Sequence, residues 1–238
     1  MKKAAAFAAA LLLLVGCAPG DDGVVVLGAA STRALNGSLA ELSPAPLEFF
    51  NAGSSTLVQQ LADGSPGDVL ITADEATMDA ALAQGLVADP RVVATNTLVM
   101  VVPQGNPAGI RGVGDLGPDT ALVLCDEQVP CGAVSRRLID AGGWEVHPVS
   151  LEHAVSDVLG KVVSGEADAG WVYRTDAVAA GDRVEVIDLP GAANHPNSLV
   201  AAATTTARDA AEARAFVDLL TSAEMTPVWK NHGFTPTR

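Results

Sequence analysis

The chain has 238 residues, of which 49% are hydrophobic and 18% are charged, and its formal net charge is −14. This composition is typical of a folded globular protein, and the length allows one large domain or two lobes. A chain this acidic is poorly suited to nucleic acid or to an anionic membrane face, because both bind basic surfaces. We therefore expect no nucleic-acid partner.

The N-terminus has the pattern of an export signal. Lysines at positions 2 and 3 precede an almost wholly apolar run at residues 4–15, which is too short for a membrane span. The run ends in Leu-Val-Gly-Cys, which resembles a bacterial lipobox. We predict a signal peptide at residues 1–16, a lipid anchor on Cys17 and a tether at residues 17–23. The alternative is an ordinary signal peptide with an incidental cysteine.

The first part of the chain alternates apolar runs with helical patterns. Strands are predicted at residues 24–28, 47–50 and 69–72. Leucines recur at helical spacing after Ser31, so we expect Ser31 to cap a helix. Further helices are predicted from residue 57 to 64 and at 74–84.

A second alternating series follows a Gly- and Pro-rich stretch at residues 104–118. Such alternation is typical of an α/β protein with mainly parallel sheets, and two series predict two lobes. If the last helices return to the first lobe, segments 97–102 and 198–204 are the crossing strands. The remaining strands are predicted near 121–124, 145–149, 169–173 and 184–189, and the helices near 132–141, 153–164 and 207–221.

Three strand-to-helix junctions carry small residues: Ser31, Ser54-Ser55 and Cys131-Gly132. Ligands of α/β sheets bind at such junctions, where helix starts offer free N–H groups and a positive dipole end. Capping is the commoner role for a single serine, but recurrence in both lobes favours an anion site. Neutral donors in a cleft that excludes water can hold an anion despite the negative net charge.

Catalysis is not indicated by the sequence. The serines lack a G-x-S-x-G motif, and the four histidines, at positions 147, 153, 195 and 232, form no H-E-x-x-H motif. A lipoprotein hydrolase with Ser31 or Ser54 as nucleophile is the alternative from another class, and it needs a histidine base within reach.

Six segments, in this order, carry a family resemblance: GAAST at 28–32, NAGSSTL at 51–57, GDVLITAD at 67–74, VPCG at 129–132, GEADAGWVYRTDA at 165–177 and GFTP at 233–236. Together they resemble the periplasmic molybdate-binding proteins of ABC importers, the ModA family. Each segment is weak alone, but their order and spacing are specific, and the likeness covers nearly all of residues 24–238.

The resemblance implies a type II-like periplasmic-binding-protein fold, in which two α/β lobes enclose a ligand cleft. Lobe 1 would comprise residues 24–98 and 200–238, and lobe 2 residues 99–199. The implied function is capture of molybdate or tungstate for the membrane permease of an ABC importer, by a monomer with no cofactor and no enzymatic activity. Molybdenum would be present only within the oxyanion. Another tetrahedral oxyanion, sulfate or phosphate, is the alternative ligand.

Carried over by motif, the ligand would be held by three hydroxyls and two backbone N–H groups: those of Ser31, Ser54 and Tyr173, and those of Cys131 and Val155. Ser55 is a second candidate, because adjacent serines leave the register open. None of the five is a carboxylate, and a phosphate site usually needs an acceptor for the ligand's proton.

The two remaining cysteines flank this binding segment. The family commonly has a small residue such as alanine at the place of Cys131, and a backbone donor tolerates the change if the side chain points away. Cys125 and Cys131 are left as an even pair in an oxidising compartment once Cys17 carries lipid. We therefore predict that they form a disulfide that stiffens the ligand loop.

Overall fold

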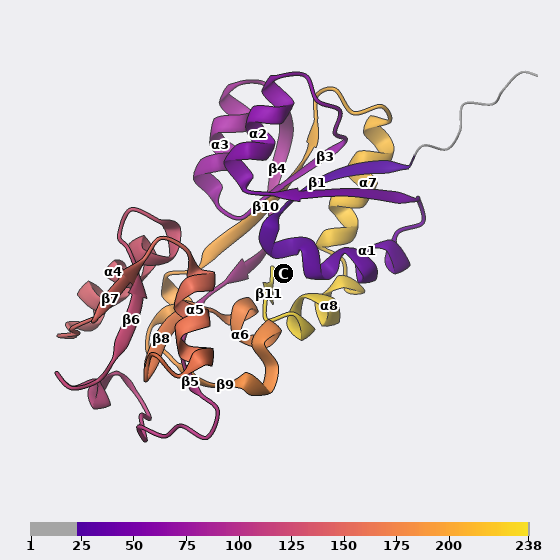
Figure 1. The fold of residues 1–238 in the computed structure, drawn as a ribbon. Coiled ribbons are helices and arrows are strands. Elements are labelled where there is room, and N and C mark those ends of the chain that lie inside the picture. Colours follow the sequence, from indigo (N-terminus) through magenta and orange to yellow (C-terminus); the bar gives the residue numbers. More distant parts are fainter. Residues whose placement is uncertain (1–22, 238) are drawn as a thin grey trace, which may run out of the picture.

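The computed structural model describes residues 23–237, so the predicted signal peptide and Cys17 lie outside the described residues. Within this range the strands form one sheet of six and one of five strands, each flanked by helices (Figure 1). The expected two-lobed α/β fold class is confirmed. No helix between residues 23 and 237 is long and apolar enough to cross a membrane.

The first sheet has the strand order β11-β4-β10-β3-β1-β2. Helices cover both of its faces, and alternate residues of β1 belong to two different apolar clusters. Helices α2 and α3 pack on one face, and η1, α1, α7 and α8 on the other. The strands are β1 (Val24–Ala29), β2 (Leu47–Ala52), β3 (Val69–Thr72), β4 (Val87–Asn96), β10 (Asn197–Thr204) and β11 (Thr235–Pro236). The helices are η1 (Ala30–Leu35), α1 (Asn36–Leu42), α2 (Ser54–Ala62), α3 (Glu75–Ala83), α7 (Ala210–Leu220) and α8 (Met225–Asn231).

The second sheet has the order β7-β6-β8-β5-β9 and one continuous apolar core around Trp171. The ring of Trp144 meets that of Trp171 edge-on, with centroids 6.0 Å apart. The strands are β5 (Leu98–Pro103), β6 (Leu122–Cys125), β7 (Ser150–Glu152), β8 (Ala169–Tyr173) and β9 (Val184–Asp188). The helices are α4 (Pro130–Gly142), α5 (Val155–Ser164) and α6 (Arg174–Ala180), with short 3-10 turns η2 (Val113–Asp115), η3 (Gly181–Arg183) and η4 (Ala192–Asn194).

The passage between the lobes differs from the sequence prediction. Among the described residues, β5 pairs only within the second sheet and β10 only within the first, so neither strand is shared by both sheets. The chain crosses at Thr97, between β4 and β5, and again between β9 and β10. These strands run antiparallel to their neighbours, which makes both sheets mixed rather than mainly parallel. β4 escaped prediction because Pro90 interrupts it; Asp89 beside it has φ 50°, and the β4–β10 register shifts at this point.

Two local predictions were wrong. The strand expected at 145–149 begins only at Ser150, where β7 pairs with β6, and Pro148 has no N–H with which to join a ladder. Ser31 is not a helix cap: Ala29 occupies that position before η1, and Ser31 is the second residue of η1. Thr32 makes the local bond instead, donating its hydroxyl to the Ala29 carbonyl at 2.8 Å.

The first aspartates of the 67–74 and 165–177 motifs, Asp68 and Asp168, stabilise the fold. Asp68 is buried before β3 and accepts from the N–H of Val25, at the start of β1, at 2.8 Å. Asp168, before β8, accepts in the same way from the N–H of Ala121 at 2.9 Å. Burial alone would raise the pKa of Asp68, but hydrogen bonds from Arg208 and the Val25 N–H outweigh it and lower the pKa. The two aspartates therefore fix neighbouring strand starts, one in each lobe.

Candidate functional site

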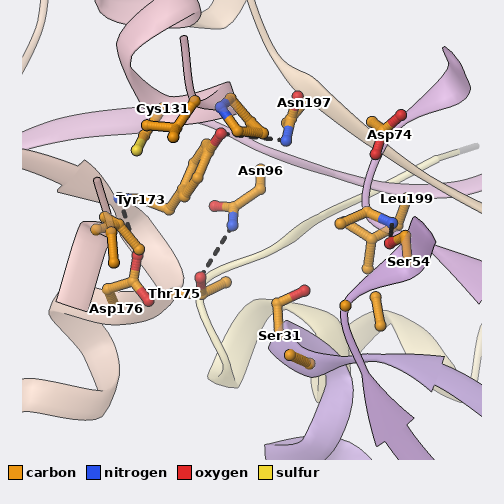
Figure 2. Close-up of a pocket in the computed structure, with 18 of the residues that line it drawn as sticks. Ser31, Ser54, Asp74, Asn96, Cys131, Tyr173, Thr175, Asp176, Asn197 and Leu199 are labelled. Atoms are coloured by element: carbon orange, nitrogen blue, oxygen red, sulfur yellow. Dashed lines mark hydrogen bonds between the residues drawn. The ribbon is translucent and has the colours of Figure 1, made fainter. Parts of the chain in front are cut away.

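A cleft of about 480 Å³ lies where strand ends and helix starts of the two lobes face each other (Figure 2). Its volume falls in the usual range for small-molecule sites. All five residues carried over from the family motifs line it, two from lobe 1 and three from lobe 2: Ser31, Ser54, Cys131, Val155 and Tyr173. Residues that are far apart in the sequence thus meet around one space.

Lobe 1 presents its two serines in different ways. Ser31 follows β1 in η1, and its hydroxyl points into the cleft (Figure 2). Ser54 is the first residue of α2, and its oxygen accepts a hydrogen bond from the N–H of Ala73 at 3.0 Å. Its own O–H is therefore available to a ligand. Ser55 is exposed and does not line the cleft, which distinguishes the two adjacent serines.

Lobe 2 presents backbone N–H groups at two helix starts. Cys131 is the second residue of α4, and Val155 is the first residue of α5. The N–H groups of a first helical turn have no acceptor within their own helix, and the helix dipole adds positive potential there. Both positions therefore offer a neutral donor to a ligand in the cleft.

A disulfide between Cys125 and Cys131, with Cα atoms 5.7 Å apart, joins the end of β6 to the first turn of α4. The Cys131 side chain is thus committed to Cys125, which leaves its backbone N–H for the cleft. The next residue must be glycine, because a Cβ on Gly132 would lie 1.9 Å from the Asp126 carbonyl oxygen. The loop between the cysteines is therefore held against the helix that it precedes.

Tyr173 ends β8 and brings a half-buried phenol to the cleft. Burial raises the pKa of Tyr173, and the negative charges of Asp176 and Asp74 act in the same direction. The side-chain amide of Asn197 donates to the phenol oxygen at 3.2 Å. The phenol therefore stays protonated, with its O–H as a donor.

The sequence prediction missed several polar residues that the fold brings into the cleft: Asp74, Asn96, Thr175, Asp176 and Asn197. Burial raises the pKa of Asp176 to about 6, although a hydrogen bond from the Tyr173 N–H lowers it in part. Above that pH the cleft wall carries this carboxylate. Asp74 caps α3, accepting from the N–H and the hydroxyl of Thr77. The only sequence signal for Asp176 was its position within the 165–177 motif.

Positive charge is scarce at this site. Neither a lysine nor an arginine is among the described residues that line the cleft, and His153 is the only basic type there. Between residues 23 and 237, no three Asp, Glu, His or Cys side chains gather as a metal site. The donors available to a ligand are therefore hydroxyls, amides and helix-start N–H groups.

This two-lobed fold with a cleft of inward-facing neutral donors is that of a solute-binding protein. Residues 26–235 match the family model of bacterial extracellular solute-binding proteins, and the chain belongs to this family.

Named relatives agree with this class. The chain is 39% identical over 226 residues to the molybdate-binding protein ModA of Mycobacterium tuberculosis, which covers 92% of this chain and 87% of the relative. It is 28% identical over 193 residues to a putative ABC transporter substrate-binding lipoprotein of Bacillus subtilis, covering 78% and 74%. The substrate-binding domain of a putative molybdenum ABC transporter from Clostridium difficile superposes with a TM-score of 0.78 at 22% identity, covering 90% of this chain and 99% of that one.

Substitution of Gly132 tests the close contact behind the Cys131 N–H. We expect Gly132→Ala to lower the free energy of unfolding by roughly 1–3 kcal/mol, because the new methyl group forces the Asp126 backbone away. Gly160→Ala is the matched control, since a Cβ at this exposed position in α5 meets nothing within 4 Å and should stabilise by up to about 1 kcal/mol. Urea unfolding measures both; equal stability of the two variants would contradict the contact.

Proposed function

We propose that this protein captures molybdate or tungstate outside the cytoplasm and delivers it to the membrane permease of an ABC importer. The observation that carries the proposal is the convergence of neutral donors from both lobes on one cleft that no lysine or arginine of residues 23–237 lines. The identity to mycobacterial ModA over nearly the whole chain supports the choice of ligand.

The donor set suits a compact dianion. An oxyanion without a proton has acceptors on all its oxygens, so it can take several N–H and O–H bonds at once, and bonds to a charged acceptor are the strong kind. A chain of net charge −14 gives no long-range attraction for such a ligand. Selectivity and affinity must therefore come from short-range hydrogen bonds inside the cleft.

The cleft is larger than a five-atom anion needs. We propose that the lobes close on the ligand by bending where the chain crosses between them, around Thr97 and before β10. Closure would bring the lobe 2 donors to an oxyanion already held by the serines of lobe 1. The permease would then distinguish the closed from the open form.

Binding rather than catalysis is the role that we propose. The fold brings His153 into the cleft from lobe 2, which the sequence reasoning did not foresee. It makes no hydrogen bond to Ser31 or Ser54 among the described residues, so the pair required of a serine hydrolase is not formed. The family and the relatives are solute-binding proteins.

Hydrogen phosphate is the second candidate ligand, and Asp176 is the observation that favours it. A ligand that carries a proton needs an acceptor in its site, and this carboxylate lines the cleft. An unprotonated Asp176 would instead repel molybdate, so the same residue weakens the first candidate above pH 6.

A lipid anchor on Cys17 is the second part of the proposal. It rests on the lipobox-like sequence at residues 14–17 and on the lipoprotein name of the Bacillus subtilis relative. Mass spectrometry of protein recovered from membranes should find Cys17 as a lipid-modified first residue, and Cys17→Ala should release the protein from the membrane fraction. A mature chain that begins at another residue without lipid would contradict the anchor.

Isothermal titration with molybdate, tungstate, sulfate and phosphate at one pH tests the ligand. We expect molybdate and tungstate to bind at least about tenfold more tightly than the other two, a difference of about 1.4 kcal/mol. Ser54→Ala should weaken molybdate binding, whereas Ser55→Ala, outside the cleft, should not. Tight binding of phosphate or sulfate with no response to molybdate would refute the proposal.

A further inference from the structure

Three hydroxyls along the cleft share one arrangement, in which the oxygen accepts a hydrogen bond from an N–H group (Figure 2). The donors are a backbone amide in one case and asparagine side chains in the other two. The pairs are Ala73 N to Ser54 Oγ at 3.0 Å, Asn96 Nδ2 to Thr175 Oγ1 at 2.9 Å, and Asn197 Nδ2 to Tyr173 Oη at 3.2 Å.

This arrangement determines what a hydroxyl can do for a ligand. A hydroxyl has one proton to donate and accepts through its lone pairs. When an N–H group donates to the hydroxyl oxygen from one side, the O–H proton points in another direction. For these three hydroxyls the remaining directions include the cleft. Because burial keeps the Tyr173 phenol protonated, this hydroxyl has its proton to give at any physiological pH.

The two asparagines lie where the lobes join. Asn197 begins β10 and faces Asn96, at the end of β4, as its cross-strand partner in the antiparallel pair. Both side chains reach from the lobe 1 sheet to the segment that starts α6 in lobe 2. The backbone is tied at the same point, since the Arg174 N–H donates to the Thr97 carbonyl at 2.9 Å.

We propose that Asn197 sets the direction of the Tyr173 hydroxyl, so that this hydroxyl donates to the bound oxyanion and does not accept from it. The inference rests on the proposed function and adds a positioning residue to it. A cleft whose hydroxyls are turned to donate matches an oxyanion without a proton.

The test measures, by titration with molybdate, how much the Tyr173 hydroxyl contributes to molybdate affinity in two backgrounds. In the wild-type background, Tyr173→Phe is expected to weaken binding roughly 10–100-fold, the effect of one hydrogen bond to a charged group. In the Asn197→Asp background the new carboxylate accepts the hydroxyl proton, so the same change should cost less than about 2-fold. Any repulsion of the ligand by that carboxylate is present with and without the hydroxyl, and it cancels in the comparison.

A purely structural role for Asn197 predicts the opposite result. An aspartate at position 197 would still hold the tyrosine ring in place, and the hydroxyl would contribute as much to molybdate affinity as in the wild type. Ser198→Asp is the charge control, because side chains of successive strand residues point to opposite faces and Ser198 does not line the cleft. In that background Tyr173→Phe should cost as much as in the wild type.

Asn197→Ala provides a second comparison should the aspartate variant fail to fold. Without the amide the hydroxyl can rotate freely, so its contribution to molybdate affinity should fall below that in the wild type. Tyr173 is the only tyrosine in the chain, so selective ¹³C labelling gives a single ring signal that reports the state of its hydroxyl.

An equal loss of molybdate affinity on Tyr173→Phe in all backgrounds would overturn the role of Asn197 alone. Failure of the wild-type protein to bind molybdate would overturn the proposed function and this inference with it.

Discussion

The proposed function places one demand on this structure: a dianion must be held out of water without a cationic side chain. Neutral donors do this only if several of them point at one place and stay there, because each hydrogen bond depends on distance and angle. The chain meets the demand at the ends of strands, where helix-start N–H groups and hydroxyls project into the cleft. A rigid sheet behind each donor keeps the geometry fixed without the ligand.

Several features that bind nothing themselves serve this rigidity. Asp68 and Asp168 fix neighbouring strand starts in their own lobes. The Cys125–Cys131 disulfide fixes the first turn of α4, and a disulfide closing so short a loop contributes about 2 kcal/mol by the chain-entropy estimate. Asn96 and Asn197 connect the crossing between the lobes with the hydroxyls of Thr175 and Tyr173. The crossing and the site are thus parts of one hydrogen-bonded region, which gives a physical route by which ligand contact and lobe closure can be coupled.

The sequence predicted the two-lobed α/β fold because strand and helix periods alternate clearly, and the five site residues carried over from the motifs all line one cleft. It could not predict β4, since Pro90 lies inside a strand that tolerates it only through an irregular register with β10. It could not place Asn96 and Asn197 together, because their contact depends on pairing between strands about a hundred residues apart. Ser31 resembled a helix cap because capping and ligand contact use the same residue type at the same junction. The sequence also did not place His153, Asp74 and Asp176 in the cleft, because their positions there depend on tertiary structure.

The central claim is that a molybdate ion lies between the two lobes and is held by neutral donors. Anomalous diffraction at the molybdenum edge from crystals of the complex tests it directly. The claim predicts one molybdenum peak in the cleft, with oxygens about 2.6–3.2 Å from the hydroxyls of Ser31, Ser54 and Tyr173 and from the N–H groups of Cys131 and Val155. A peak outside the cleft, or one whose oxygens are bound by an arginine or lysine side chain, would contradict it.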